Sequence, residues 1–126
     1  MLRCVLLAAA LCAGPLTAFA QMPRSFPAQA LRGELQVVQP PEVLVNGQPA
    51  RLAPGARIRG QNNMLQMSGA IAGQSLLVHY TRDFDGLLRD VWVLTAAEAA
   101  RKPWPVSETE AKAWAFDPVG QTWSKP

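Results

Sequence analysis

The chain has little of the chemistry that catalysis and metal binding need. Its 126 residues include two cysteines, Cys4 and Cys12, and a single histidine, His79. Both cysteines lie in the first 20 residues, and without them the chain has no disulfide and no thiol chemistry. A lone histidine without cysteine does not make a zinc site. The sequence therefore predicts neither a metal ion nor another cofactor.

The chain also lacks a concentrated charge of one sign. Twelve basic and nine acidic residues give a net charge of +3, and eleven basic residues remain once Arg3 is removed, a net charge near +2. Residues 34–67 contain Arg51, Arg57 and Arg59 but no aromatic residue. A groove for single-stranded nucleic acid combines positive charge with aromatic stacking platforms. We therefore expect no nucleic-acid partner, and solvated arginines on a strand are the simpler interpretation.

The first 20 residues have the organisation of a secretory signal peptide. Arg3 provides a positive start, residues 5–13 form an apolar run, and Ala18 and Ala20 are the small residues that a signal peptidase reads. Cleavage is expected before Gln21. The apolar run is shorter than the roughly 20 residues that a transmembrane span needs. The sequence predicts export, and a mature chain that does not span the membrane.

Short strand-like segments separated by turn residues fill the middle of the chain. Asn46-Gly47 and Asp85-Gly86 are pairs that tolerate the positive φ angles of tight hairpin turns. Pro54-Gly55 predicts a further turn. The predicted strands are 34–38, 43–45, 48–52, 57–59, 64–67, 75–81 and 87–94.

The hairpin around residues 85–86 is the most regular of these predictions. Side chains on its first strand alternate between two faces, and its second strand is rich in β-branched and aromatic residues. A tight turn at 85–86 pairs residues whose numbers add to 171. His79 is therefore predicted to face Trp92, and Thr81 to face Asp90.

Two short helices are predicted near the C-terminus. Thr95 and Glu98 form a capping-box pattern, and Ser107 and Glu110 repeat it. The last residues, with Trp123, are predicted to be loose.

Six or seven short antiparallel strands followed by one or two helices are typical of a mainly β chain folded as a small barrel or sandwich. The predicted parts are a cleaved signal peptide (1–20), a flexible arm (21–32), a β domain (33–94) and a helical C-terminal appendage (95–126).

The β domain also carries a resemblance. Val45-Asn46-Gly47, residues 52–58 and residues 83–87 are similar to the turn regions of small exported β-barrel proteins of unknown function in Gram-negative bacteria. The similar region covers roughly half of the chain. The resemblance implies an OB-like or similarly small barrel in the periplasm, and it implies no catalytic residues.

A small hydrolase or lyase is the alternative from a different class of function. It would use His79 with Asp83 and Asp90, and it requires these side chains to converge in one pocket. A histidine packed beside Trp92 is the simpler interpretation, and we expect no enzyme.

Calcium binding is a weaker alternative at the central hairpin. Asp83, Asp85 and Gly86 match part of a calcium loop, but position 92, where the closing glutamate belongs, is Trp92. A hairpin turn explains these residues without a metal ion.

The favoured hypothesis is a non-catalytic binding or envelope-accessory module. Its proposed surface combines the late tryptophans Trp104, Trp114 and Trp123, whose rings suit a sugar or a peptide, with Arg57 and Arg59 on a face of the β domain. The expected partner is an envelope protein or a glycan. A structural subunit of an envelope assembly is a further possibility, and its sign would be an exposed apolar strand edge.

Overall fold

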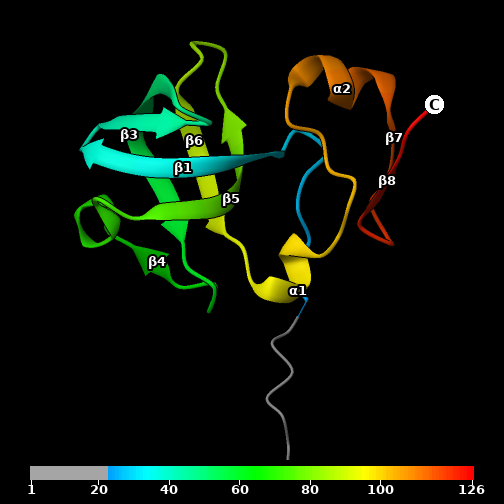
Figure 1. Cartoon of the computed structure of the whole chain (residues 1–126), viewed down its shortest axis with the longest axis horizontal. Coiled ribbons are helices and arrows are strands. Elements are labelled where there is room, and N and C mark those ends of the chain that lie inside the picture. Colours follow the sequence, from blue (N-terminus) through cyan, green and yellow to red (C-terminus); the bar gives the residue numbers. More distant parts are fainter. Residues whose placement is uncertain (1–22) are drawn as a thin grey trace, which may run out of the picture.

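The structure is a computed structural model that describes residues 23–126 (Figure 1). The predicted signal peptide and its cleavage residues Ala18, Ala20 and Gln21 lie outside the described residues. Strands dominate, as the sequence predicts. The strands are β1 (Leu31–Gln39), β2 (Glu42–Val45), β3 (Gln48–Arg59), β4 (Leu65–Gln66), β5 (Ser75–Arg82), β6 (Leu88–Val93), β7 (Ala115–Asp117) and β8 (Thr122–Ser124). The helices are the 3₁₀ turn η1 (Ser68–Ile71), α1 (Ala96–Ala99) and α2 (Glu108–Ala113).

Six of these strands form one sheet in the order β2-β1-β5-β6-β3-β4. Strand β2 also pairs with β3, so the hydrogen-bonded pairs run round a ring of five strands, with β4 attached to β3. The β3–β6 pair is parallel, whereas the other pairs are antiparallel. The prediction of antiparallel strands throughout is therefore wrong for this pair. Its two strands are joined through β4, η1 and β5, a connection long enough to return in the same direction.

Strand β3 is longer than predicted. The sequence suggested two strands separated by a turn at Pro54-Gly55, but residues 48–59 form one continuous strand. Gly55 has a φ of 75°, and the register of β3 against β6 shifts between Leu52 and Arg57. The proline and glycine therefore bend the strand without reversing it, and its two halves take different partners, β2 and β6.

Both predicted hairpins are present. Asn46 and Gly47 have φ angles of 52° and 78°, as a two-residue turn with positive φ at both central positions requires. In the second hairpin His79 lies opposite Trp92 and Thr81 opposite Asp90, which confirms the predicted register. The turn itself is wider than two residues and spans positions 83–87.

The apolar side chains form two separate cores. The first fills the ring, where Leu31, Tyr80, Val91 and Ile58 follow one another across β1, β5, β6 and β3. The second lies outside the ring and joins it to the C-terminal segment, which Figure 1 shows beside the ring. Its buried members are Phe26, Ala30, Leu94, Trp104 and Trp123.

The second core corrects two sequence predictions. The segment expected to be a flexible arm packs against the sheet, since Phe26 is 3% exposed, and β1 already begins at Leu31. The last residues are not loose, because β7 and β8 form a hairpin in which Trp123 is 6% exposed. In each case an aromatic side chain is buried on the outer face of the ring, where it removes apolar surface from water.

The two helices begin where the sequence predicts. Thr95 and Glu98 form the complete capping box at the start of α1. Ser107 accepts a hydrogen bond from the backbone N–H of Glu110 at the start of α2. Helix α2 ends at Ala113, and Trp114 is its C-terminal cap residue. No helix among residues 23–126 has the length and apolar character to cross a membrane.

Candidate functional site

Two of the predicted binding tryptophans are core residues. Trp104 is 4% exposed, donates a hydrogen bond from Nε1 to the Ala30 carbonyl at 2.9 Å, and stacks on His79 with 4.1 Å between ring centres. Trp123 stacks on Phe116 with 4.7 Å between ring centres. These rings join the C-terminal segment to the sheet, so they offer no open face for a ligand.

Trp114 is half-buried, and the Nζ atom of Lys125 lies 5.2 Å from its ring centre. Its ring therefore already has a cation as neighbour. The three tryptophans do not form the exposed surface that the binding hypothesis requires.

The two predicted arginines have different surroundings. Arg57 is exposed and lies opposite Asp90 in the β3–β6 register. Arg59 is half-buried and lies opposite Trp92. Arg59 and Trp92 line a groove, whereas Arg57 does not.

The structure does not assemble the proposed catalytic group. His79 is 1% exposed, and besides its stacking on Trp104 its ring centre lies 4.5 Å from that of Phe26. Asp90 bonds to Thr81, and within residues 23–126 no carboxylate forms a hydrogen bond or an ion pair with His79. Burial, with the positive charges of nearby arginines, lowers the pKa of His79 from 6.5 to about 3. The imidazole is therefore neutral at neutral pH and enclosed by aromatic rings.

Asp83 organises the wide turn of the central hairpin. Its Oδ1 atom accepts hydrogen bonds from the backbone N–H groups of Asp85 and Leu87, each at 3.0 Å. Among the described residues no cluster of three acidic, histidine or cysteine side chains is placed to hold a metal ion. The turn therefore accounts for the residues that resembled a calcium loop.

A row of four side chains crosses the outer face of the ring. Arg32, His79, Trp92 and Arg59 lie opposite one another in turn on β1, β5, β6 and β3. Arg32 is buried, and its Nη2 atom donates a hydrogen bond to the Glu98 carbonyl at 2.9 Å. The row therefore has an arginine at each end and an aromatic centre.

A buried ion pair fixes α1 beside this row. The guanidinium of Arg24 donates to both carboxylate oxygens of Glu98, at 2.9 and 2.5 Å, and to the carbonyls of Gly60 and Val93. Burial by itself raises the pKa of the Glu98 carboxyl, but hydrogen bonds from Arg24 and Thr95 and the charge of Arg24 outweigh it. The net result is a pKa below the usual value, so Glu98 is ionised at neutral pH.

The groove beside α1, called the arginine groove below, has a volume of about 1100 Å³. It contains Trp92 as its aromatic wall and Glu98 as its acidic residue. Trp92 lies between Arg59 and His79 in the row, and Glu98 is paired with Arg24. The polar and charged residues that line it are Arg24, Ser25, Arg59, Gln61, Asn62, Asn63, Thr95, Glu98 and Arg101.

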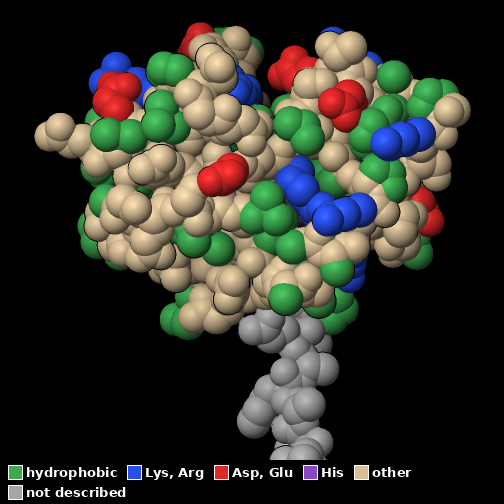
Figure 2. All heavy atoms as spheres, in the orientation of Figure 1, with side chains coloured by type: hydrophobic (Ala, Val, Ile, Leu, Met, Phe, Trp, Pro, Cys, Tyr) green, Lys and Arg blue, Asp and Glu red, His purple; other side chains and the backbone are tan. Residues whose placement is uncertain are grey.

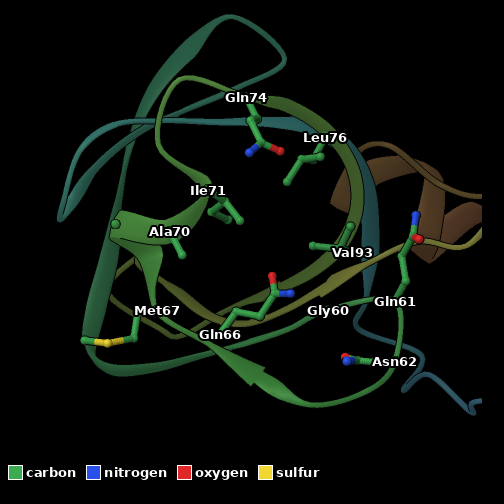
Figure 3. A pocket seen from close by; sticks show the side chains of 11 residues that line it. Gly60, Gln61, Asn62, Gln66, Met67, Ala70, Ile71, Gln74, Leu76 and Val93 are labelled. Atoms are coloured by element: carbon green, nitrogen blue, oxygen red, sulfur yellow. The ribbon is translucent and has the colours of Figure 1, made fainter.

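A second groove, called the mouth groove below, opens at one end of the ring and has a volume of about 960 Å³ (Figure 3). Ile71, Leu76 and Val93 form apolar parts of its wall. The carboxamides of Gln66 and Gln74 point toward the opening from opposite sides (Figure 3). Both glutamines are exposed, and neither carboxamide bonds to another side chain or backbone group in the described residues.

The turn after β3 separates the two grooves. Gln61 and Asn62 line both of them. Gln61 donates from Nε2 to the Leu94 carbonyl at 2.9 Å, and Asn62 accepts from the Met64 N–H at 3.0 Å. Gly60 leaves room for Gln66, because a Cβ atom at position 60 would lie 2.4 Å from its Nε2 atom.

Sequence reasoning identified one lining residue, Arg59, and missed the others. Gln66 and Gln74 belong to no motif, and Arg24 lies in a segment that was predicted to be a mobile arm. No motif in the sequence pointed to Arg101. On the face shown in Figure 2, basic and acidic side chains are interspersed. Comparison with protein-family models, curated protein sequences and solved structures finds no match to this chain.

Proposed function

We propose that this chain is an exported, non-catalytic binding module of the periplasm, built on a small OB-like barrel. The ring of five paired strands supports this fold, because the OB fold is a five-stranded Greek-key barrel that binds oligosaccharides and oligonucleotides through one face and its loops. The signal-peptide pattern of residues 1–20 supports the location.

The mouth groove is the observation that carries the proposed binding role. Ligand sites are typically concave and largely apolar, with a small number of polar groups that fix the ligand. Gln66 and Gln74 supply such groups across a wall that contains Ile71, Leu76 and Val93. A carboxamide both donates and accepts hydrogen bonds, as a sugar hydroxyl does. We therefore propose a neutral glycan chain of the envelope as the ligand.

The test is an NMR titration of the protein, expressed as the full-length precursor in a Gram-negative host and purified from the envelope. Mass spectrometry of the product should show Gln21 as its first residue. The probes are a soluble chito-oligosaccharide and, as a second sugar, maltotriose. We expect saturable shifts of the amide signals of Ile71, Leu76 and Val93.

A double variant and a matched control make this test specific. Gln66→Ala with Gln74→Ala should abolish the shifts, because it removes both convergent carboxamides. Gln36→Ala removes an exposed glutamine of β1 outside the groove and should leave them unchanged. Absence of shifts with both sugars, or shifts confined to another surface, would contradict the proposed ligand.

A structural subunit of an envelope assembly is the second candidate, and the edge of the sheet favours it. Strand β4 ends the strand order, and Met64, Leu65 and Met67 around it are 66%, 63% and 81% exposed. Exposed apolar edges are places where another chain can add a strand. Affinity capture from the native envelope should then yield a stoichiometric partner that Leu65→Arg removes. Leu77→Arg, at a leucine of β5 that is 40% exposed, should keep it.

A further inference from the structure

The arginine groove contains more positive charge than the protein neutralises. Glu98 is its acidic residue, and both oxygens of that carboxylate are bonded to Arg24. Arg59 and Arg101 line the same groove. The groove therefore retains two guanidinium groups that no carboxylate of its lining balances.

These two guanidinium groups are weakly engaged. The Nη1 atom of Arg101 is buried and has no hydrogen-bond partner among the described residues. Arg59 donates to the Asn63 carbonyl at 3.4 Å, which is long for such a bond. Arg24, by contrast, makes four hydrogen bonds within the fold. Arg59 and Arg101 can therefore donate further hydrogen bonds to a ligand.

Unpaired guanidinium groups of this kind favour an anionic ligand. Buried polar groups are nearly always hydrogen-bonded, and a buried charge without a partner is costly. A planar guanidinium binds carboxylate and phosphate oxygens through paired donors. The half-buried ring of Trp92, beside Arg59 in the β3–β6 register, adds an apolar wall to the same groove.

We propose that the arginine groove is an oxyanion site, in which Arg59 and Arg101 hold a carboxylate or phosphate group of a ligand that packs on Trp92. This inference concerns a different surface from the mouth groove and does not depend on a glycan binding there. The two grooves share Gln61 and Asn62 in the turn that separates them.

The experiment is an NMR titration of the same purified protein with inorganic phosphate and, separately, with acetate. Sodium chloride keeps the ionic strength constant, because a change in ionic strength by itself alters the interactions of exposed charges. We expect saturable shifts at the indole N–H of Trp92 and at the amides of Ala96 and Ala97, which line the groove. Saturation by phosphate alone would identify the bound group as a phosphoryl group. Saturation by both anions would mean that the site also binds carboxylates.

Three single variants test which arginines bind the anion. Arg101→Gln and Arg59→Gln should each weaken phosphate binding about tenfold, the loss of one hydrogen bond to a charged group. Arg57→Gln, two residues along β3 and outside the groove, should change it less than about twofold, since its guanidinium is exposed. Arg59→Gln keeps the test decisive if Arg101→Gln fails to fold, because Arg59 makes one long hydrogen bond.

Two results would overturn the proposal. One is shifts that follow ionic strength and do not saturate with either anion. The other is a loss of binding in Arg57→Gln that equals the loss in Arg59→Gln, which would mean general attraction by surface charge.

Discussion

Below pH 6.5 the protein should lose stability because the fold shifts protonation of His79 to a much lower pH. The imidazole is 1% exposed, stacked on Trp104 and in edge contact with Phe26. Burial, followed by the positive charges of Arg32, Arg24 and Arg101, lowers its pKa from 6.5 to about 3. The unfolded chain gains a proton at this residue near pH 6.5, whereas the folded chain does not.

The sign and size of the effect follow from proton linkage. Between about pH 6.5 and pH 3 the unfolded state binds more protons than the folded state, so the free energy of unfolding falls as the pH falls. The slope is about 1.4 kcal/mol per pH unit for one proton. From pH 7 to pH 5 the expected loss from His79 is about 2 kcal/mol.

Urea denaturation followed by tryptophan fluorescence measures this loss, and the variant His79→Phe is the comparison. Phenylalanine keeps an aromatic ring in the aromatic cluster but has no titrating group. The absolute stability of the variant can differ from that of the wild type through overpacking. The measured quantity is therefore the slope of the free energy of unfolding against pH between pH 7 and pH 5. Glu98 contributes at lower pH, since its stabilisation is lost as the pH falls from 4.5 through its lowered pKa.

The reasoning would be refuted by equal slopes in the wild type and in His79→Phe over this interval. That result would mean that His79 takes up a proton in the folded state near its ordinary pKa. If His79→Phe does not fold, His79→Gln provides the same comparison without a ring.

Four further substitutions test the buried ion pair, the second core and the first hairpin turn. Arg24→Met leaves the buried Glu98 carboxylate unpaired and should cost about 3–5 kcal/mol in urea denaturation; a cost within the range of surface pairs would show that solvent reaches this pair. Trp104→Ala should lower the free energy of unfolding by about 3–5 kcal/mol. Trp114→Ala should lower it clearly less, because Trp114 is half-buried. Equal shifts of the thermal midpoint in the two variants would contradict the second core. Gly47→Ala places a Cβ atom at a φ of 78° and should cost roughly 1–2 kcal/mol by calorimetry; no measurable loss would exclude this turn conformation.

The hairpins were predictable because their signals are local. Asn46-Gly47 accepts positive φ angles that most residues avoid, and the alternation along β5 determines which side chains share a face. The register that placed His79 opposite Trp92 followed from the position of Asp85-Gly86 in the other hairpin. The capping box at Thr95 and Glu98 is local in the same way, since its two hydrogen bonds join residues three positions apart.

The candidate grooves were much less predictable. Arg24 and Glu98 are 74 residues apart in the chain, and no pattern in the sequence indicates that they pair. Gln66 and Gln74 meet at the mouth groove because β4, η1 and β5 bring them there. The role of a side chain in such a groove depends on neighbours that are distant in the sequence.

The amino-acid sequence by itself determined the mainly β character, the two hairpin turns and the start of each helix, since these depend on φ angles and hydrogen bonds within a few residues. The tertiary structure decided the parallel pairing of β3 with β6, the burial of Phe26, Trp104 and Trp123, and the surplus of positive charge beside α1. Such features arise when segments far apart in the chain exclude water from one another, and the free energy of that contact belongs to neither segment alone.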